Sequence, residues 1–111
     1  MLARCLRERE RRLFVAEGGD GSLLGFAAAA LARGAGPVAE RARGEIDWLF
    51  VRAEARRRGT GSALVAAALA WLGGEGAARV EVQVAHGNAD GRAFWQALGF
   101  APTMDVLERR L

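Results

Sequence analysis

Near the middle of the chain, residues 51–62 read VRAEARRRGTGS. We predict a strand that ends at Val51, then a short loop through Gly59 and Gly61, and then a helix. The first turn of a helix has backbone N–H groups without partners and carries a partial positive charge. Glycines let a bulky anion approach these amides, and the arginines at 56–58 add positive charge beside them. The stretch therefore predicts an anion-binding turn suited to a pyrophosphate.

Two better-known phosphate motifs do not fit this stretch. A nucleotide P-loop would end in Lys followed by Ser or Thr, which is absent here. The dinucleotide-binding fingerprint would need a glycine at Leu64. Taken alone, the Gly59 turn is also compatible with a tight turn that binds nothing.

The residues around this turn indicate a chain that alternates between strands and helices. Apolar periodicity and turn residues predict strands over residues 13–17, 22–31, 45–51, 79–84 and 103–107, and helices over residues 2–12, 62–72 and 89–98. Gly18–Gly21 would join the first two strands as a hairpin. Gly73-Gly74 and Gly99 would end the last two helices. The order α-β-β-β-α-β-α-β predicts an α/β (α+β) domain with a mixed sheet.

The strand predicted over residues 45–51 carries large apolar groups on both faces. Glu45, Asp47, Leu49 and Val51 would lie on one face and Ile46, Trp48 and Phe50 on the other, because successive side chains of a strand alternate. Such a strand belongs in the middle of a sheet. Four large residues read as core or interface: Trp48, Trp71, Phe14 and Phe26.

Composition limits the function classes. The 111 residues suit one domain, 1–111, and no apolar run approaches the ~18 needed to span a membrane. The single cysteine, Cys5, cannot form an internal disulfide, so we expect a cytoplasmic protein. The net charge is only +3, and basic residues are not interleaved with aromatics, so we expect no nucleic acid as partner.

A second motif lies downstream and, with the first, resembles the GNAT N-acetyltransferase family. The acyl-CoA loop of that family reads Arg/Gln-x-x-Gly-x-Gly/Ala after a strand that ends in valine, as Arg56, Gly59 and Gly61 do here. Its second motif is Asn, an aromatic pair and Leu-Gly-Phe. Here Asn88, Phe94-Trp95 and residues 98–100 fall at matching spacing. The resemblance covers about residues 13–107 and implies a GNAT-like, mostly antiparallel mixed sheet flanked by helices.

The resemblance implies acetyl-CoA as acyl donor and a set of residues that hold it. Backbone amides from the Gly59 turn would face the pyrophosphate, and the end of the central strand would pair with the pantetheine arm like an added strand. Asn88, Phe94 and Trp95 would line the same cleft near the thiol. The implied set is Leu49, Phe50, Val51, Arg56, Arg57, Arg58, Gly59, Thr60, Gly61, Ser62, Asn88, Phe94 and Trp95.

The sequence departs from the family pattern in two places. The second aromatic is usually a tyrosine, proposed to protonate the departing thiolate, whereas Trp95 stands here and an indole N–H is no substitute. The first strand and first helix of the family also have no counterpart before the predicted hairpin. This suggests either a start placed too late or a second copy that completes the sheet beside residues 13–17. We therefore expect a homodimer.

The chemistry implied by the resemblance is direct attack of an amine on the thioester. A lysine-like amine has a pKa of about 10.4, so making it neutral at pH 7 costs roughly 4–5 kcal/mol. A carboxylate, directly or through water, can take the proton. The candidates are Glu45 and Asp47, and then His86. Glu45 comes first because it aligns with the base of some relatives. No metal site is expected, because one cysteine and one histidine cannot supply it.

Three functions remain open at this point. The first is an N-acetyltransferase acting on a small-molecule amine or on a protein or peptide amine. The second is an acyl-CoA-binding or regulatory module with a degenerate catalytic site, which Trp95 favours. The third is a basic nucleic-acid-binding domain, which we expect least.

Overall fold

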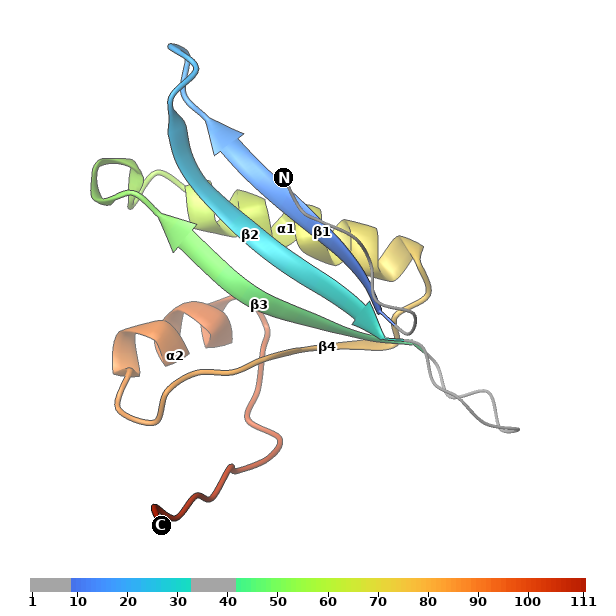
Figure 1. The fold of residues 1–111 in the computed structure, drawn as a ribbon. Coiled ribbons are helices and arrows are strands. Elements are labelled where there is room, and N and C mark those ends of the chain that lie inside the picture. The colour runs from blue at the N-terminus through green and yellow to red at the C-terminus, as the bar shows by residue number, and fades with distance from the viewer. Residues whose placement is uncertain (1–8, 33–41) are drawn as a thin grey trace.

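The described part of the chain forms one four-stranded sheet and two helices (Figure 1). The computed structural model describes residues 9–32 and 42–111. The elements are β1 (Arg9–Glu17), β2 (Leu23–Ala32), β3 (Arg43–Val51), the 3-10 helix η1 (Ala53–Ala55), α1 (Thr60–Gly74), β4 (Arg79–Val82) and α2 (Ala89–Ala97). Strand order is β1-β2-β3-β4, with β1–β2 and β2–β3 antiparallel and β3–β4 parallel. This confirms the predicted mixed, mostly antiparallel sheet.

The predicted hairpin is confirmed, and its first strand is longer than predicted. Its turn is closed by a bond from the Gly18 N–H to the Ser22 carbonyl, and Gly21 has a φ of 83°. The Asp20 carboxylate accepts from both the hydroxyl and the amide of Ser22, which lowers the pKa of Asp20. Pairing with β2 extends β1 back to Arg9. The prediction of a helix over residues 2–12 is therefore wrong for residues 9–12, and residues 2–8 lie outside the described part.

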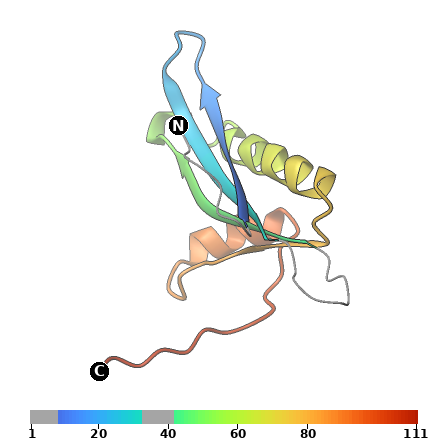
Figure 2. The ribbon, with the colours of Figure 1, turned by 45° about the vertical axis from the view of Figure 1, so that its right-hand side comes forward.

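Strand β2 is rich in alanine, yet it lies in the middle of the sheet. Alanine favours helices, but here hydrogen bonding to β1 and β3 overrides that preference. The small side chains let α1 pack closely on this strand. The core between helix and sheet is built from Ala29, Leu31, Ala42, Ile46, Val65, Ala68 and Leu72. Figures 1 and 2 show α1 along one face of β1, β2 and β3.

The end of α1 differs from the prediction. The helix is predicted to stop before Gly73-Gly74 but includes both glycines, and Gly74 is its last residue. The chain instead leaves the helix at Gly76, which has a φ of 92°. Bonds from Gly76 N to Gly73 O and from Ala77 N to Leu72 O form the paired C-terminal closure of a Schellman motif. By contrast, Gly99, at a φ of 95°, follows α2 as predicted.

The strand predicted over residues 103–107 is absent, so that prediction is wrong. Residues 100–111 have no regular secondary structure, and Met104, Val106 and Leu107 are at least 79% exposed. A strand needs a neighbour for its backbone hydrogen bonds, and no described strand lies beside this segment. Strand β4 likewise ends at Val82 rather than at residue 84.

Candidate functional site

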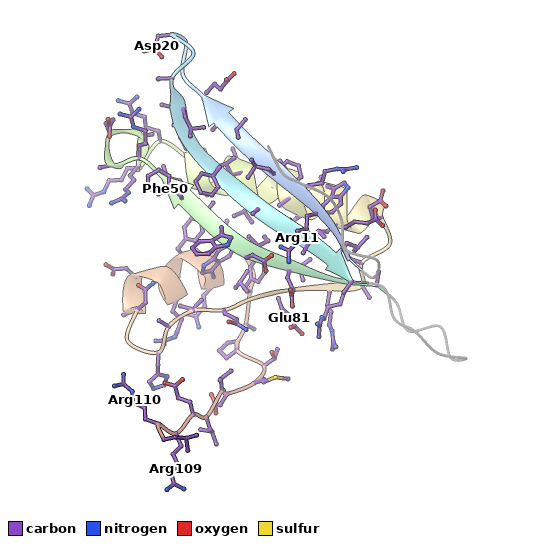
Figure 3. All side chains as sticks on the ribbon, in the orientation of Figure 1. Arg11, Asp20, Phe50, Glu81, Arg109 and Arg110 are labelled. Atoms are coloured by element: carbon purple, nitrogen blue, oxygen red, sulfur yellow. The ribbon has the colours of Figure 1, made fainter. Side chains whose placement is uncertain are left out.

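The centre of the site is the place where β3 and β4 separate. The two parallel strands pair only from Arg43–Arg79 to Ile46–Val82. Strand β3 continues to Val51, so residues 48–51 pair with β2 on one side and with no described strand on the other. Figure 3 shows Arg11 and Glu81 near the closed end of this divergence and Phe50 near its open end. Apart from the Val51 carbonyl, which accepts from Arg56, the backbone groups on this edge at Leu49 to Val51 are available to an extended ligand.

The Gly59 turn lies directly beyond the end of β3 and begins α1 as predicted. Gly59 adopts a left-handed conformation, with a φ of 78°, and has no side chain to cap the helix. The first helical bond runs from Ala63 N to Gly59 O. By helix geometry, the amides of Thr60, Gly61 and Ser62 then have no acceptor within α1. Unpaired amides and the helix dipole at this end of the helix are features that suit an anion.

One of the three arginines before the helix is bonded to the protein's own backbone. The Arg56 Nε atom donates to the Val51 carbonyl at 3.1 Å, so this side chain fastens the loop to the end of β3. Arg57 has a φ of 64°, an uncommon value for a residue with a side chain. The exposed Arg57 and Arg58 carry the cationic character of the loop.

One arginine that sequence reasoning missed, Arg52, shapes the same loop. Its guanidinium bonds the Leu23 carbonyl at 3.3 Å and the Glu54 carboxylate at 2.9 Å. A backbone hydrogen bond and, after it, the Arg52 charge lower the pKa of Glu54. Arg52 thus joins the loop to β2. No sequence pattern signals this contact, because its partners lie in different elements.

The two sequence motifs meet in space at Gly61 and Phe94. A Cβ atom placed on Gly61 would lie 3.4 Å from Cζ of Phe94 and 3.6 Å from Cγ2 of Val51. The aromatic motif on α2 therefore packs against the first turn of α1 and the end of β3. Residues 51, 61 and 94, which are far apart in the sequence, enclose one region beside the open edge.

Asn88 begins α2 by capping it. Its side-chain oxygen accepts a hydrogen bond from Gly91 N at 2.9 Å. Such a cap satisfies one of the unpaired amides of the first turn. The structure therefore gives Asn88 a structural role, while its predicted place beside the pantetheine stays a prediction.

The cap makes a prediction about stability. We expect Asn88→Ala to lower the free energy of unfolding by about 1 kcal/mol, the usual cost of a lost cap. Asn88→Asp should cost much less, because a carboxylate can accept the same bond. Urea unfolding of the two variants checks this, and equal losses would contradict the capping role.

Trp95 belongs to an aromatic cluster. Its ring lies edge-to-face with Phe94 at 5.2 Å and with Phe100 at 5.0 Å between ring centroids. The Phe100 amide also donates to the Trp95 carbonyl at 3.0 Å. Trp95 thus attaches the end of α2 to the segment after it, which is a packing role rather than proton transfer.

A β-bulge places the two candidate carboxylates. In the β2–β3 pairing, Ala28 faces Trp48 but Ala29 faces Ile46, so Asp47 is an extra residue in β3. Asp47 contacts Arg11 of β1, and Arg11 shares its row of the sheet with Ala30 and Glu45. Glu45 and Asp47 therefore lie on one face, as predicted.

The bulge also overturns part of the predicted strand pattern. Phe50 pairs with Phe26 of β2, and Trp48 pairs with Ala28. Both side chains lie on the face of the sheet that carries Glu45, which is the face away from α1. Leu49 instead packs with the core under α1. The predicted separation of Glu45 and Asp47 from Trp48 and Phe50 is therefore wrong, because one extra residue shifts the alternation of side chains.

Both carboxylates already have basic neighbours. Asp47 Oδ2 lies 2.8 Å from Nη1 of Arg11, and Glu45 Oε2 lies 3.5 Å from Nη2 of Arg43. Arg43 also lies 3.9 Å from Glu81, the residue that pairs with Glu45 across the β3–β4 register. An acceptor ammonium would therefore compete with a guanidinium for either carboxylate, and most directly at Asp47.

His86 lies in the turn between β4 and α2 and is exposed. Its carbonyl accepts a hydrogen bond from Nη2 of Arg92 at 2.7 Å. This bond fixes the backbone of the turn, and no contact ties the imidazole to the open edge. The structure therefore does not bring His86 together with the two carboxylates.

A groove of about 540 Å³ lies between β1 and the start of α1. Its wall includes Val15, Arg58, Gly59 and Thr60, but neither Val51 nor Phe94. It is thus separate from the open edge of β3. Among the described residues, no helix is long and apolar enough to cross a membrane, and no group of His, Cys, Asp or Glu is suited to hold a metal.

The sequence matches the model of the acetyltransferase (GNAT) family over residues 1–100. The chain belongs to the GNAT acetyltransferase family. In this GNAT protein, the turn with Gly59 and Gly61 begins α1. A search of the curated proteins finds no match.

Solved structures share the fold. A Pyrococcus furiosus protein described as an acetyl transferase is 24% identical, with a TM-score of 0.78 over 92% of this chain and 66% of its own. The BH1408 protein from Bacillus halodurans is 19% identical, with a TM-score of 0.81 over 91% and 66%. Aminoglycoside N-acetyltransferase AAC(6')-Iy, solved with CoA, is 27% identical, with a TM-score of 0.77 over 89% and 74%. The chain thus spans about two thirds of the length of the first two proteins.

Proposed function

We propose that this chain transfers an acetyl group from acetyl-CoA to an amine. The observation that carries the proposal is the convergence of the Gly59 turn, the open edge of β3 and Phe94. Unpaired amides at the start of α1 suit a pyrophosphate. Apart from the Val51 carbonyl, which accepts from Arg56, the backbone groups on the open edge at Leu49 to Val51 suit the amide-containing pantetheine arm. Family membership and the CoA complex of AAC(6')-Iy support the same donor.

In this proposal, the acceptor amine attacks the thioester carbon directly. The amine nitrogen forms the new amide bond, the carbon–sulfur bond breaks, and CoA leaves as a thiolate. A carboxylate on the face of Glu45 and Asp47, or a water held there, takes the proton from the amine. Because Trp95 is no useful proton donor and the sequence has no tyrosine, solvent protonates the thiolate.

The acceptor is a small-molecule amine or a protein or peptide amine. The GNAT relatives give no single answer, although AAC(6')-Iy was also solved with the bisubstrate analogue CoA-S-monomethyl-acetylneamine. Turnover across a panel of amines, measured as release of free thiol, tests the proposal. Acetyl-CoA-dependent thiol release with at least one amine is expected.

A second function is favoured by one observation, the packing of Trp95 against two aromatic rings. Its ring is held between Phe94 and Phe100, so the residue that replaces the usual tyrosine serves packing. An acyl-CoA-binding or regulatory module would keep the donor cleft and need no proton donor. Acetyl-CoA binding without thiol release from any amine would support this module over the enzyme.

The base assignment makes a testable prediction. We expect Glu45→Gln to lower kcat about 100-fold, the lower end of what a general base contributes. The dissociation constant of acetyl-CoA should stay the same, because the pyrophosphate end of the proposed cleft is not altered. Asp47→Asn is the matched variant and should have a smaller effect, since Arg11 already occupies that carboxylate. A larger loss of kcat in Asp47→Asn than in Glu45→Gln would show that Asp47 is the general base.

A further inference from the structure

Residues 52–58 join the end of β3 to the turn that begins α1, and we call them the connecting loop. The loop contains the short helix η1 and then Arg57, whose φ is 64°. Gly59 follows with a φ of 78°. A positive φ costs free energy in a residue with a side chain, so it persists only where neighbouring contacts hold the backbone. The contacts of the connecting loop therefore decide where α1 begins.

The connecting loop has little burial to hold it. Ala55 is 1% exposed and is the one buried residue of the loop. Within the loop, the Arg56 amide donates to the Ala53 carbonyl at 3.3 Å. The Arg56 side chain then fastens the loop to the Val51 carbonyl. The remaining support comes from polar contacts at the first residue of the loop.

Four polar contacts meet at this first residue, Arg52. Its amide donates to the Leu24 carbonyl at 2.8 Å, and its carbonyl accepts from the Ala55 amide at 2.9 Å. Its Nη1 donates to the Leu23 carbonyl at 3.3 Å, and its Nη2 donates to the Glu54 carboxylate at 2.9 Å. The two backbone contacts are open to other residue types, whereas the two side-chain contacts need the guanidinium.

The side-chain contacts of Arg52 are suited to fixing the loop rather than to stabilising the whole fold. The Arg52 side chain is 45% exposed and that of Glu54 is 64% exposed. Exposed ion pairs of this kind add little to the free energy of unfolding. The Nη1 bond, however, ties the connecting loop to the first residue of β2, which is far from it in the sequence. Losing it would loosen the loop and leave the sheet intact.

We propose that Arg52 is a positioning residue for the acyl-CoA donor, an inference that rests on the proposed function. Its side chain holds the connecting loop against β2 and thereby fixes the unpaired amides of Thr60, Gly61 and Ser62. Arg52 acts through these amides, since its own guanidinium is bonded to Leu23 and Glu54. A ligand binds a fixed loop more tightly, because less conformational freedom is lost on binding.

This role depends on the shape of the arginine side chain more than on its charge. A guanidinium presents several donors in a rigid plane, so Arg52 can reach a carbonyl and a carboxylate at the same time. A lysine has a single nitrogen on a flexible stem and cannot reproduce this geometry. Arg52→Lys therefore separates positioning from simple attraction between a cation and the phosphates.

The test is isothermal titration of the full chain with acetyl-CoA. We expect Arg52→Ala to raise the dissociation constant about 5-fold, the effect of one lost hydrogen bond. Arg52→Lys should raise it roughly 3-fold, although the charge is kept. The matched control is Arg109→Ala, which removes an exposed arginine from the C-terminal segment and should bind like the wild type (Figure 3). Circular dichroism should show all three variants folded.

A double-mutant cycle with Gly61→Val shows whether Arg52 acts through the amides. The valine fills the space beside Phe94 and Val51, over the first turn of α1. In a chain that already carries Gly61→Val, Arg52→Ala should raise the dissociation constant less than about 2-fold, because the two changes affect the same contacts. A role in general stability would give the same loss with and without the valine.

Three results would overturn the positioning role while the wild type binds acetyl-CoA. These are wild-type affinity in Arg52→Ala, wild-type affinity in Arg52→Lys, and an undiminished effect of Arg52→Ala beside Gly61→Val. The first would show that the contacts of Arg52 are not needed, the second that charge alone acts, and the third that the amides are not involved. A wild type that binds no acetyl-CoA would overturn the proposed function together with this inference.

Discussion

Gly61→Val is expected to weaken acetyl-CoA binding about 30-fold. The new Cβ would lie 3.4 Å from Phe94 and 3.6 Å from Val51, and its two methyl groups would fill the space over the first turn of α1. Loss of one or two hydrogen bonds to a charged group costs about 2 kcal/mol, which corresponds to the stated change in dissociation constant. Isothermal titration with acetyl-CoA measures it.

The matched control is Gly73→Val, in the same helix. A Cβ at Gly73 has no neighbour within 4 Å, so this variant makes the same change of residue without touching the site. Its affinity for acetyl-CoA should equal that of the wild type. If the two variants bind equally well, the amides at the start of α1 do not hold the cofactor.

The largest effect on stability is expected for Gly25→Ala. A Cβ at this position would overlap the carbonyl oxygen of Phe50 and lie 3.1 Å from Cα of Val51 and 3.3 Å from Cδ1 of Leu64. Two of these three atoms are backbone, so the strands must move apart. We expect a loss of about 3 kcal/mol, as for overpacked interiors, and a fall in Tm of more than ~10 °C.

Gly19→Ala provides the control for this variant. Gly19 lies in the hairpin turn and a Cβ there meets nothing within 4 Å. We expect it to change the free energy of unfolding by less than about 0.5 kcal/mol. Similar urea midpoints for the two variants would show that the close contact of β2 with the end of β3 is not needed for stability.

The sequence predicts the turn of the proposed donor site because that turn depends on local patterns. Gly59 has a positive φ, and Gly61 lies against Phe94 and Val51, so the turn can be predicted from glycines at a fixed spacing after Val51. The Asn88 cap and the Gly99 stop are local in the same way. These residues therefore lie where the sequence predicts them.

The errors arise where distant partners decide the structure. Residues 9–12 are charged and favour a helix by themselves, but they form a strand because they pair with β2. Residues 103–107 alternate like a strand but find no neighbour among the described residues. The bulge at Asp47 cannot be predicted from the alternation of side chains along a strand. The residues before it and the residues after it each still alternate between the two faces of the sheet.

The surroundings of the two candidate carboxylates also cannot be predicted from sequence patterns. The pairing of Arg11 with Asp47 joins residues of β1 and β3 that only the register brings together. The same register gathers Val15, Phe26 and Phe50 into one row. Strand spacing alone predicts neither contact, because both depend on how three strands align.

Acetyl-CoA binding is the central claim, and one titration tests it most directly. Thermal unfolding of the chain is followed at increasing concentrations of acetyl-CoA and of longer acyl-CoAs. We expect a saturable rise in Tm with at least one of them, since a ligand that binds only the folded state stabilises it by about 2.7 kcal/mol at 100 times its dissociation constant. No rise with any acyl-CoA at millimolar concentration would contradict the account.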